Sequence, residues 1–252
     1  MSGSLHDLVI NLSSAAIAFA AGWSFDRVRD VWRFRSVRGF WKQFATRDLK
    51  VVTSIFIKEE HYIWERSGLV GVGDVLALNE LRQQLYRVGV SHLPLTPSHQ
   101  LTGLERQGNL VLVGGPHSNQ VTAEVMRRLP VTFSFGAVET HDANIYDALT
   151  GEVMRCVMDS NDQLTVDQGL LIRATNPFNR ERHVIILAGS FGFGTSAAAR
   201  LLAGSDLLNN PVVAEGHPFE AVFSVEIAGG TPQQIELRKL RQLDSTMLRA
   251  GA

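Results

Sequence analysis

Residues 109–119 (NLVLVGGPHSN) carry the strongest signal of the fold class in this chain. They begin with a short, almost continuously apolar run, which is typical of a strand buried on both faces of a parallel sheet. Gly114 and Gly115 end this run, and a helical pattern follows over residues 119–129. A buried strand that passes through glycines into a helix is the repeating unit of an α/β protein.

The same strand-to-helix pattern occurs before and after this segment. The other predicted elements are strands at 49–57, 131–135, 169–173 and 183–187, helices at 74–88 and 195–203, a polar surface hairpin or insertion at 140–169, and a C-terminal β-hairpin at 219–243. The predicted buried side of the helix at 74–88 comprises Val75, Leu78, Leu81, Leu85 and Val88. We therefore predict an α/β protein with a Rossmann-like parallel sheet and a C-terminal β-hairpin.

The first fifty residues predict a membrane anchor. From Leu8 to Phe25 no side chain is charged, and the run that follows to Arg47 carries seven basic residues against two acids. About 18 uncharged residues come close to the ~20 that cross a bilayer as a helix, and the basic flank would stay in the cytosol. We predict a transmembrane helix at 1–25, a basic amphipathic juxtamembrane helix at 26–47, and a cytosolic α/β nucleotide-sensing domain at 48–252. The protein would be a single-pass protein of the inner (plasma) membrane, with its C-terminal domain in the cytoplasm.

Three other interpretations of the N-terminal segment stay open. A cleaved signal peptide would use the A-x-A site at 18–20, although residues 1–7 lack the basic side chains of an n-region. A helix buried in a soluble protein is compatible with the moderate hydrophobicity of the segment. A helix lying in the membrane interface is the third.

Polar and small residues of the predicted span share one helical face. Asn11, Ser14, Ala18 and Gly22 recur at helical spacing, and small residues let helices approach closely in lipid. This face predicts packing between helices of a homo-oligomer, with the polar groups turned toward partners or a pore. The alternative is a weakly hydrophobic helix with incidental serines.

Composition bounds the remaining part of the chain. The 252 residues carry a formal net charge of −1 and include one cysteine, Cys156. The near-neutral charge argues against a generally basic nucleic-acid-binding surface. The single cysteine excludes disulfides within the chain and any cysteine-cluster metal site, and it fits a reducing compartment. The histidines show no metal-ligand spacing, so no metal or other cofactor is predicted.

Three glycine-rich corners follow predicted strands. Such corners gather at the carboxyl ends of parallel strands, where glycine admits a ligand close to the backbone and helix N-termini attract anions. They favour a phosphate-bearing ligand, and the alternative is three structural turns. None is a Walker A loop or a regular G-x-G-x-x-G. The candidate ligand-binding residues at the corners are Gly71, Gly73, Asp74, Gly114, Gly115, His117, Asn119, Gly189, Gly192, Gly194 and Thr195.

Three further side chains could complete the same pocket, and each also has an ordinary structural alternative. Arg173 could grip a phosphate through its guanidinium fork or form a surface ion pair. Asn176, like Asn119, suits hydrogen bonding to a base or ribose, but asparagine is also common at turns and helix caps. Glu124 could act as a general base, whereas most glutamates on a helix are simply solvated. No catalytic triad is predicted.

The motifs Gly114-Gly115-Pro116-x-x-Asn119 and Gly189-x-x-Gly192-x-Gly194-Thr195 resemble those of the Rossmannoid nucleotide-sensing domains of the SLOG and STALD type, found in bacterial antiviral defence. With the N-terminal helix, the layout is similar to the membrane effector of the Hailong defence system. That resemblance implies a channel-like homo-oligomer in the lipid bilayer. It would respond to a nucleotide or short oligonucleotide that a partner nucleotidyltransferase makes.

The sequence departs from the related phosphoribohydrolase-like enzymes at one motif. Those enzymes carry Pro-Gly-Gly-x-Gly-Thr and then a glutamate, whereas this chain has Ala188-Gly189-Ser190 and alanines at 197–199. The resemblance therefore implies binding more than hydrolysis. Two alternatives remain: a membrane-tethered nucleotide or NAD hydrolase with Glu124 or Asp74 as acid or base, and a structural protein whose glycines only make turns.

Overall fold

The computed structural model describes residues 34–56, 66–140 and 142–244. The predicted transmembrane helix, with Asn11, Ser14, Ala18 and Gly22, lies outside the described residues. Within the described ranges, every helix is too short or too polar to cross a membrane.

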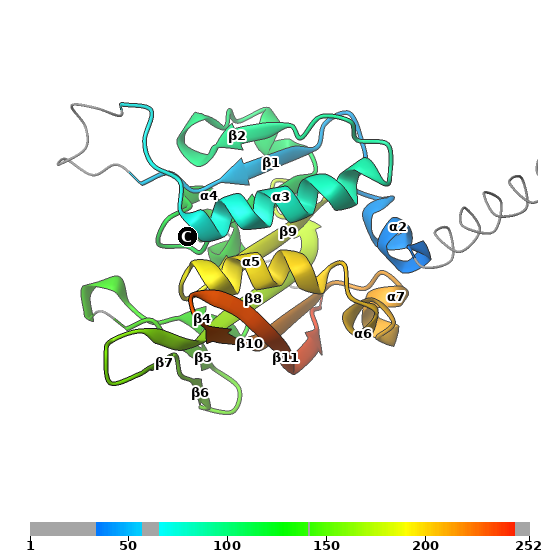
Figure 1. Ribbon diagram of the computed structural model, residues 1–252. Helices are drawn as coiled ribbons and strands as arrows, with labels where there is room; N and C mark the ends of the chain where they lie inside the picture. The colour runs from blue at the N-terminus through cyan, green and yellow to red at the C-terminus, as the bar shows by residue number, and fades with distance from the viewer. Residues whose placement is uncertain (1–33, 57–65, 141, 245–252) are drawn as a thin grey trace, which may run out of the picture.

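A mixed sheet forms the centre of the fold (Figure 1). Its main path has the strand order β11-β10-β8-β9-β3-β1-β2, and a short strand, β7, pairs with β8. The strands are β1 (Lys50–Thr53), β2 (Leu95–Pro97), β3 (Leu110–Val113), β7 (Val157–Met158), β8 (Leu164–Asn176), β9 (Asn179–Gly189), β10 (Phe219–Ala228) and β11 (Thr231–Gln242). β2, β1, β3 and β9 run parallel, whereas β7, β8, β10 and β11 are antiparallel to their neighbours.

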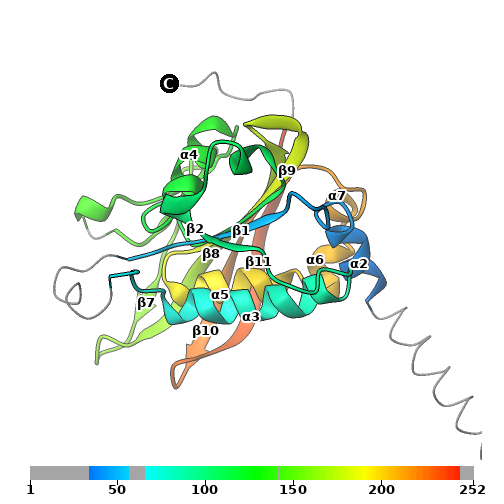
Figure 2. The same ribbon diagram turned by 90° about the horizontal axis from the view of Figure 1, so that it is seen from above.

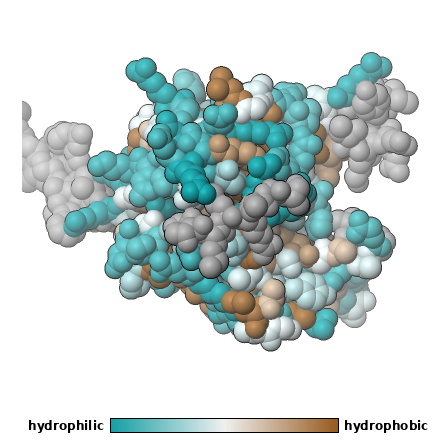
Figure 3. All heavy atoms as spheres, turned by 180° about the vertical axis from the view of Figure 1, so that it is seen from behind, coloured by the Kyte–Doolittle hydropathy of each residue, from teal (hydrophilic) through white to brown (hydrophobic). Residues whose placement is uncertain are grey.

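Helices cover both faces of the sheet. Figure 2 shows α3 (Val72–Tyr86) and α5 (Gly192–Leu201) on one face and α4 (Gln120–Arg128) on the other. Alternate residues of the strands serve the two cores: Val51 and Val111 face the α3 and α5 side, and Val52 and Leu112 face the α4 side. Because both faces are buried, the central strands are continuously apolar, as the sequence predicts. The outer surface on the α4 side is mainly hydrophilic, with apolar residues in scattered groups (Figure 3).

A second sheet of three short strands lies beyond α4 in the chain. It contains β4 (Phe133–Phe135), β5 (Ile145–Asp147) and β6 (Val153–Met154) in antiparallel order. The buried carboxylate of Asp147 fastens this sheet to the hairpin by accepting hydrogen bonds from Arg241 Nη1 and Lys239 Nζ, both at 2.7 Å. These cations hold the pKa of Asp147 far below its usual value, with the bonds from Arg241 as the largest cause.

The predicted strands, helices and C-terminal hairpin are largely confirmed, with three differences. β8 turns back at Asn176 and pairs antiparallel with β9, so the sheet is parallel in only part of its width. The predicted strand at 131–135 belongs to the small sheet. The helix predicted at 74–88 begins at Val72. Its buried side includes Asp74 and the polar Gln84, so Val75, which was predicted to be buried, lies outside that side and is 52% exposed.

The structure describes residues 34–47 of the juxtamembrane helix predicted at 26–47, and only residues 35–41 of them are helical. This helix, α2 (Arg35–Trp41), packs on the domain through Phe40 and Trp41, and Phe44 in the turn after it is buried with them. Trp41 Nε1 donates a hydrogen bond of 2.8 Å to Oε1 of Gln84 in α3. The apolar side of this part of the predicted juxtamembrane helix is therefore buried in the core of the α/β domain.

Two single-turn helices and three short 3-10 turns complete the described fold. The helices are α6 (Ser205–Leu208) and α7 (Pro211–Ala214), which follow α5 and lie beside α2 (Figure 1). The 3-10 turns are η2 (Ser98–Gln100), η3 (Glu105–Gln107) and η4 (Val138–Thr140).

Candidate functional site

A pocket of about 880 Å³ opens at the carboxyl ends of the parallel strands. The chain leaves β1 through α3 to reach β2 on one side, and β3 and β9 lie on the other side. The strand order thus reverses beside the pocket, which is where open α/β sheets bind ligands. Of the sequence-predicted residues, those that line the pocket are Gly71, Gly73, Asp74, Gly115, His117, Gly189, Gly192 and Thr195.

The amino ends of α3 and α5 meet at the wall of this pocket. A Cβ atom at Gly73 would overlap the main chain of Gly192, so only glycine lets the two helices approach this closely. Gly189 likewise lies against main-chain atoms of its own corner, and Gly194 lies against the main chain of Gln168 in β8 and of Gly189. These glycines are therefore required for the close packing of the corners, whether or not a ligand binds there. Gly115 differs, because its nearest protein atom beyond its chain neighbours would lie 3.5 Å from an added Cβ.

Asp74 is the buried acid of the pocket. It stands in the first turn of α3, is 5% exposed and accepts a hydrogen bond from the hydroxyl of Ser54, the residue after β1. Burial raises the pKa of its carboxyl, and the bond from Ser54 opposes that rise. A buried carboxyl group with a raised pKa that lines a pocket can exchange a proton with a ligand.

Asp167 occupies the amino end of α5. Its carboxylate accepts hydrogen bonds from the backbone N–H of Phe191 at 3.1 Å and of Gly194 at 2.6 Å. Burial raises its pKa to about 6, against the lowering effect of these N–H donors. Part of the anion site predicted at this corner is thus filled by the protein. Asp167 could not be predicted from the sequence, because only the pairing of β8 with β9 brings it to the corner.

The second corner, after β3, is also held by internal hydrogen bonds. Asn119 is fully buried; its side chain accepts from the N–H of Val121 and Thr122 and donates to the backbone oxygens of Val52 and Val113. It is a helix cap whose polar atoms are all in use. Gly114, with φ +100, makes the sharp turn before it. Neither Asn119 nor Gly114 lines the pocket.

His117 lies at the pocket side of this second corner. Its Nε2 atom is 2.9 Å from the backbone oxygen of Gly136, and its ring meets Phe135 edge-on. Ser118, next to it, also lines the pocket. The corner therefore presents an imidazole, a hydroxyl and the accessible backbone of Gly115 to a ligand.

Apolar and aromatic side chains form much of the remaining wall. They are Phe56, Val72, Leu76, Met158, Leu164, Phe191 and Phe193. Asp162 and Gly230 reach the pocket from the β7–β8 and β10–β11 turns, and sequence reasoning had assigned neither turn to a site. Among the described lining residues none is lysine or arginine, so the ligand would meet backbone amides and neutral groups more than cations. Within the described ranges, no cluster of three or more His, Cys, Asp or Glu side chains could hold a metal ion.

Arg173, Asn176 and Glu124 are not in this pocket. Arg173 and Asn176 lie toward the far end of β8, where Asn176 Nδ2 donates to the backbone oxygens of Arg106 and Gly108 at 2.8 and 2.7 Å. Glu124 on α4 forms ion pairs with Arg106 and Arg128. The structure therefore separates these three residues from the glycine corners, and the prediction of one shared site was wrong for them.

The fold and the pocket define the chain as an α/β protein with a Rossmann-like parallel core and a strand-end pocket at the reversal of strand order. Neither the family models nor the curated proteins contain a match to it.

Proposed function

We propose that the α/β domain binds a nucleotide or a short oligonucleotide in the strand-end pocket, as the sensor of a membrane effector. One observation carries the binding proposal: the amino ends of α3 and α5 meet at a pocket placed where the strand order reverses. Helix amino ends and accessible glycine backbone bind phosphate groups in many α/β proteins.

The composition of the wall favours a ligand with one base and few phosphates. Phe56 and Phe191, 41% and 37% exposed, offer faces on which a base can stack. Asp74 and Asp162 would repel a polyphosphate, and the described wall has no lysine or arginine to offset them. A single phosphate beside Gly115 and Ser118 meets neutral donors instead.

Residues 8–25 supply the membrane part of the proposal. Their uncharged sequence and the resemblance to the Hailong-type effector support an oligomer whose pore responds to the ligand. Ligand binding would shift the oligomer only if the ligand prefers one of its states. Because α2 is packed on the domain, it connects the pocket-bearing body to the N-terminal segment.

A second candidate is the membrane-tethered hydrolase of a nucleotide or NAD. Asp74 favours it, since a buried carboxyl with a raised pKa lines the pocket. Glu124 does not favour the hydrolase, because its carboxylate forms ion pairs with Arg106 and Arg128 away from the pocket.

Calorimetric titration of the purified full-length chain tests the binding proposal. The ligands would be AMP, ADP-ribose, NAD and a short oligodeoxynucleotide. Gly115→Val would place side-chain atoms in the pocket and abolish binding, whereas Gly103→Val, at an exposed glycine with open space around it, would bind as wild type does. Absence of binding by wild type to all four, or equal binding by Gly115→Val, would refute the proposal.

Product analysis of the same samples separates the two candidates. Consumption of NAD or a nucleotide by wild type, lost in Asp74→Asn, would make the hydrolase the better candidate. Binding without turnover would favour the sensor.

A further inference from the structure

Arg173 is a buried cation whose charge no acid in the described part of the chain balances. It is 2% exposed, and among the described residues its one side-chain hydrogen bond runs from Nη2 to Oε1 of Gln43 at 2.8 Å. Desolvation lowers its pKa to about 10. A guanidinium has five N–H donors, and a buried charge is costly unless an opposite charge or several hydrogen bonds offset it. The group thus retains donors for a further partner.

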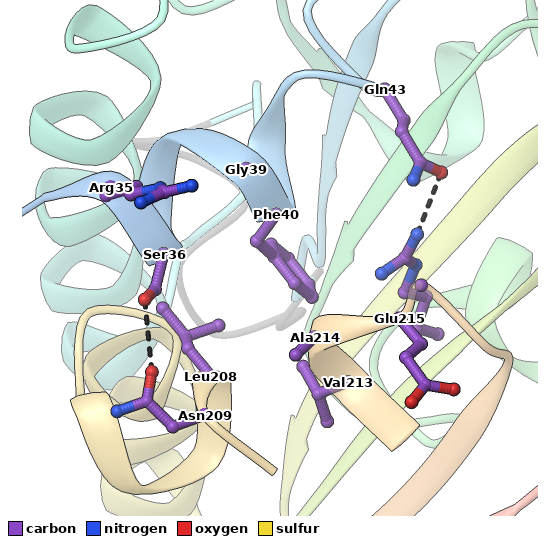
Figure 4. A pocket seen from close by; sticks show the side chains of 12 residues that line it. Arg35, Ser36, Gly39, Phe40, Gln43, Leu208, Asn209, Val213, Ala214 and Glu215 are labelled. Carbon is purple, nitrogen blue, oxygen red and sulfur yellow. Dashed lines mark hydrogen bonds between the residues drawn. The ribbon is translucent and has the colours of Figure 1, made fainter. Parts of the chain in front are cut away.

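The guanidinium lines a second pocket, of about 420 Å³, which is separate from the glycine corners. Figure 4 shows its walls, which come from α2, α6, α7 and the turn after α7. The Cζ atom of Arg173 lies 5.2 Å from the ring centroid of Phe40, so one side of the guanidinium faces an aromatic wall. Gly216 has φ +83, and a Cβ there would lie 3.4 Å from Arg173 Nη2. Glycine thus leaves space beside the donor.

The charges around this pocket favour an anion. The guanidinium of Arg173 and the amide of Gln43, which lie next to each other, both line this pocket. Glu215 is the acid that lines it, but its Oε2 atom lies 3.0 Å from Nε2 of His217, and Figure 4 shows its carboxylate pointing away from the amide of Gln43. The interior of the pocket therefore presents cationic and amide donors.

We propose that this second pocket binds the phosphate group of a small phosphomonoester or of a phospholipid, with Arg173 as its principal donor. A guanidinium binds phosphate through two parallel hydrogen bonds, and the volume exceeds what one phosphate group fills. The site is independent of the nucleotide pocket. It lies toward the opposite end of β8, because Arg173 pairs with Ile185 whereas Gly169 pairs with Gly189 at the glycine corner.

Binding of inorganic phosphate to the full-length chain tests the proposal, measured by thermal stabilisation and by titration at constant ionic strength against chloride and acetate. Phosphate should stabilise wild type. Arg173→Gln should weaken phosphate binding about tenfold or more. Arg180→Gln removes the same charge from an exposed site at the β8–β9 hairpin and should leave binding unchanged.

Gly39→Glu keeps the test decisive if Arg173→Gln fails to fold. Gly39 lines the pocket, and a Cβ added there meets no atom within 4 Å, so the new carboxylate can approach the guanidinium and should block phosphate. No response of wild type to phosphate, an equal response to acetate, or full binding by Arg173→Gln or by a folded Gly39→Glu would overturn the proposal. Gly115→Val should bind phosphate at this site normally, so failure here is distinct from failure of the nucleotide proposal.

The source of the phosphate group is decided by two parallel arms. One uses soluble glycerol 1-phosphate, and the other uses vesicles of phosphatidylcholine with and without phosphatidic acid. Arg173-dependent stabilisation by glycerol phosphate supports a soluble ligand. Arg173-dependent flotation with phosphatidic acid vesicles alone supports a lipid headgroup, and absence of both would overturn the phosphomonoester assignment.

Discussion

Gln84 offers the sharpest test of how α2 is held on the domain. It is completely buried in α3, accepts from Trp41 Nε1 and donates to the backbone oxygen of Ala199 in α5, each at 2.8 Å. Gln84→Leu keeps a similar size but leaves the indole N–H without its acceptor and removes the bond to α5. Each buried polar group left unpaired costs about 1–3 kcal/mol. With some offset from apolar burial, we expect the free energy of unfolding to fall by about 2–4 kcal/mol.

Urea denaturation and thermal melting of the full-length chain measure this loss, which corresponds to a drop in melting temperature of roughly 5–15 °C. Gln83→Leu, one residue earlier and exposed, is the matched control and should change stability by less than about 0.5 kcal/mol. Trp41→Phe alone should also destabilise, because it leaves Oε1 of Gln84 unpaired.

The double variant separates this hydrogen bond from other effects. With both partners apolar, neither group is left unpaired, so Gln84→Leu with Trp41→Phe should cost about 1–2 kcal/mol less than the two single losses added together. If α2 instead left the domain and lay on a membrane, the two single changes would be nearly neutral and additive. That result would refute the packing described for α2.

The remaining predictions concern the glycine corners. Burial raises the pKa of Asp167 to about 6, so the folded chain takes up its proton at a higher pH than the unfolded chain; from about pH 7 to about pH 4 wild type should therefore gain up to about 3 kcal/mol relative to Asp167→Asn. Denaturation at a series of pH values measures this, and an opposite slope would contradict the raised pKa. Gly73→Ala should cost more than about 3 kcal/mol or prevent folding, since its Cβ would overlap Gly192, whereas Gly39→Ala in open space should gain about 0.5–1 kcal/mol. Melting temperatures of the two variants check this pair, and similar values would argue against the close approach of α3 and α5.

The strands and helices of the parallel core could be predicted because their signals are local. β3 and β9 are buried on both faces, so their apolar runs are visible without knowledge of partners. The antiparallel part could not be derived in this way. Asn176-Pro177 is typical of a turn, but whether β8 would pair with the strand after that turn depends on contacts across the sheet.

The same missing information explains the misplacement of Arg173. The sequence shows that Arg173 follows Gly169 in one strand. It does not show the direction of that strand in the sheet. Because β8 is antiparallel to β9, Gly169 lies at the glycine corner and each later residue lies farther from it. At ~3.3 Å per residue, Arg173 is about 13 Å away. Because of this strand direction, Arg173 and the glycine corners line two different pockets, although the sequence predicted one site.

Helix α3 contacts both the strand-end pocket and α2. Its first turn supplies Gly73 and Asp74 to the strand-end pocket, and its last turns carry Gln84, which accepts a hydrogen bond from Trp41 of α2. Figure 2 shows the helix extending along the sheet from one end to the other. A helix is stiff along its axis, so a displacement of its amino end would also displace its carboxyl end. The Gln84–Trp41 hydrogen bond would then pass that displacement to α2, provided that it stays intact. If the domain is a sensor, the buried polar contact at Gln84 is where its response would pass to the N-terminal segment.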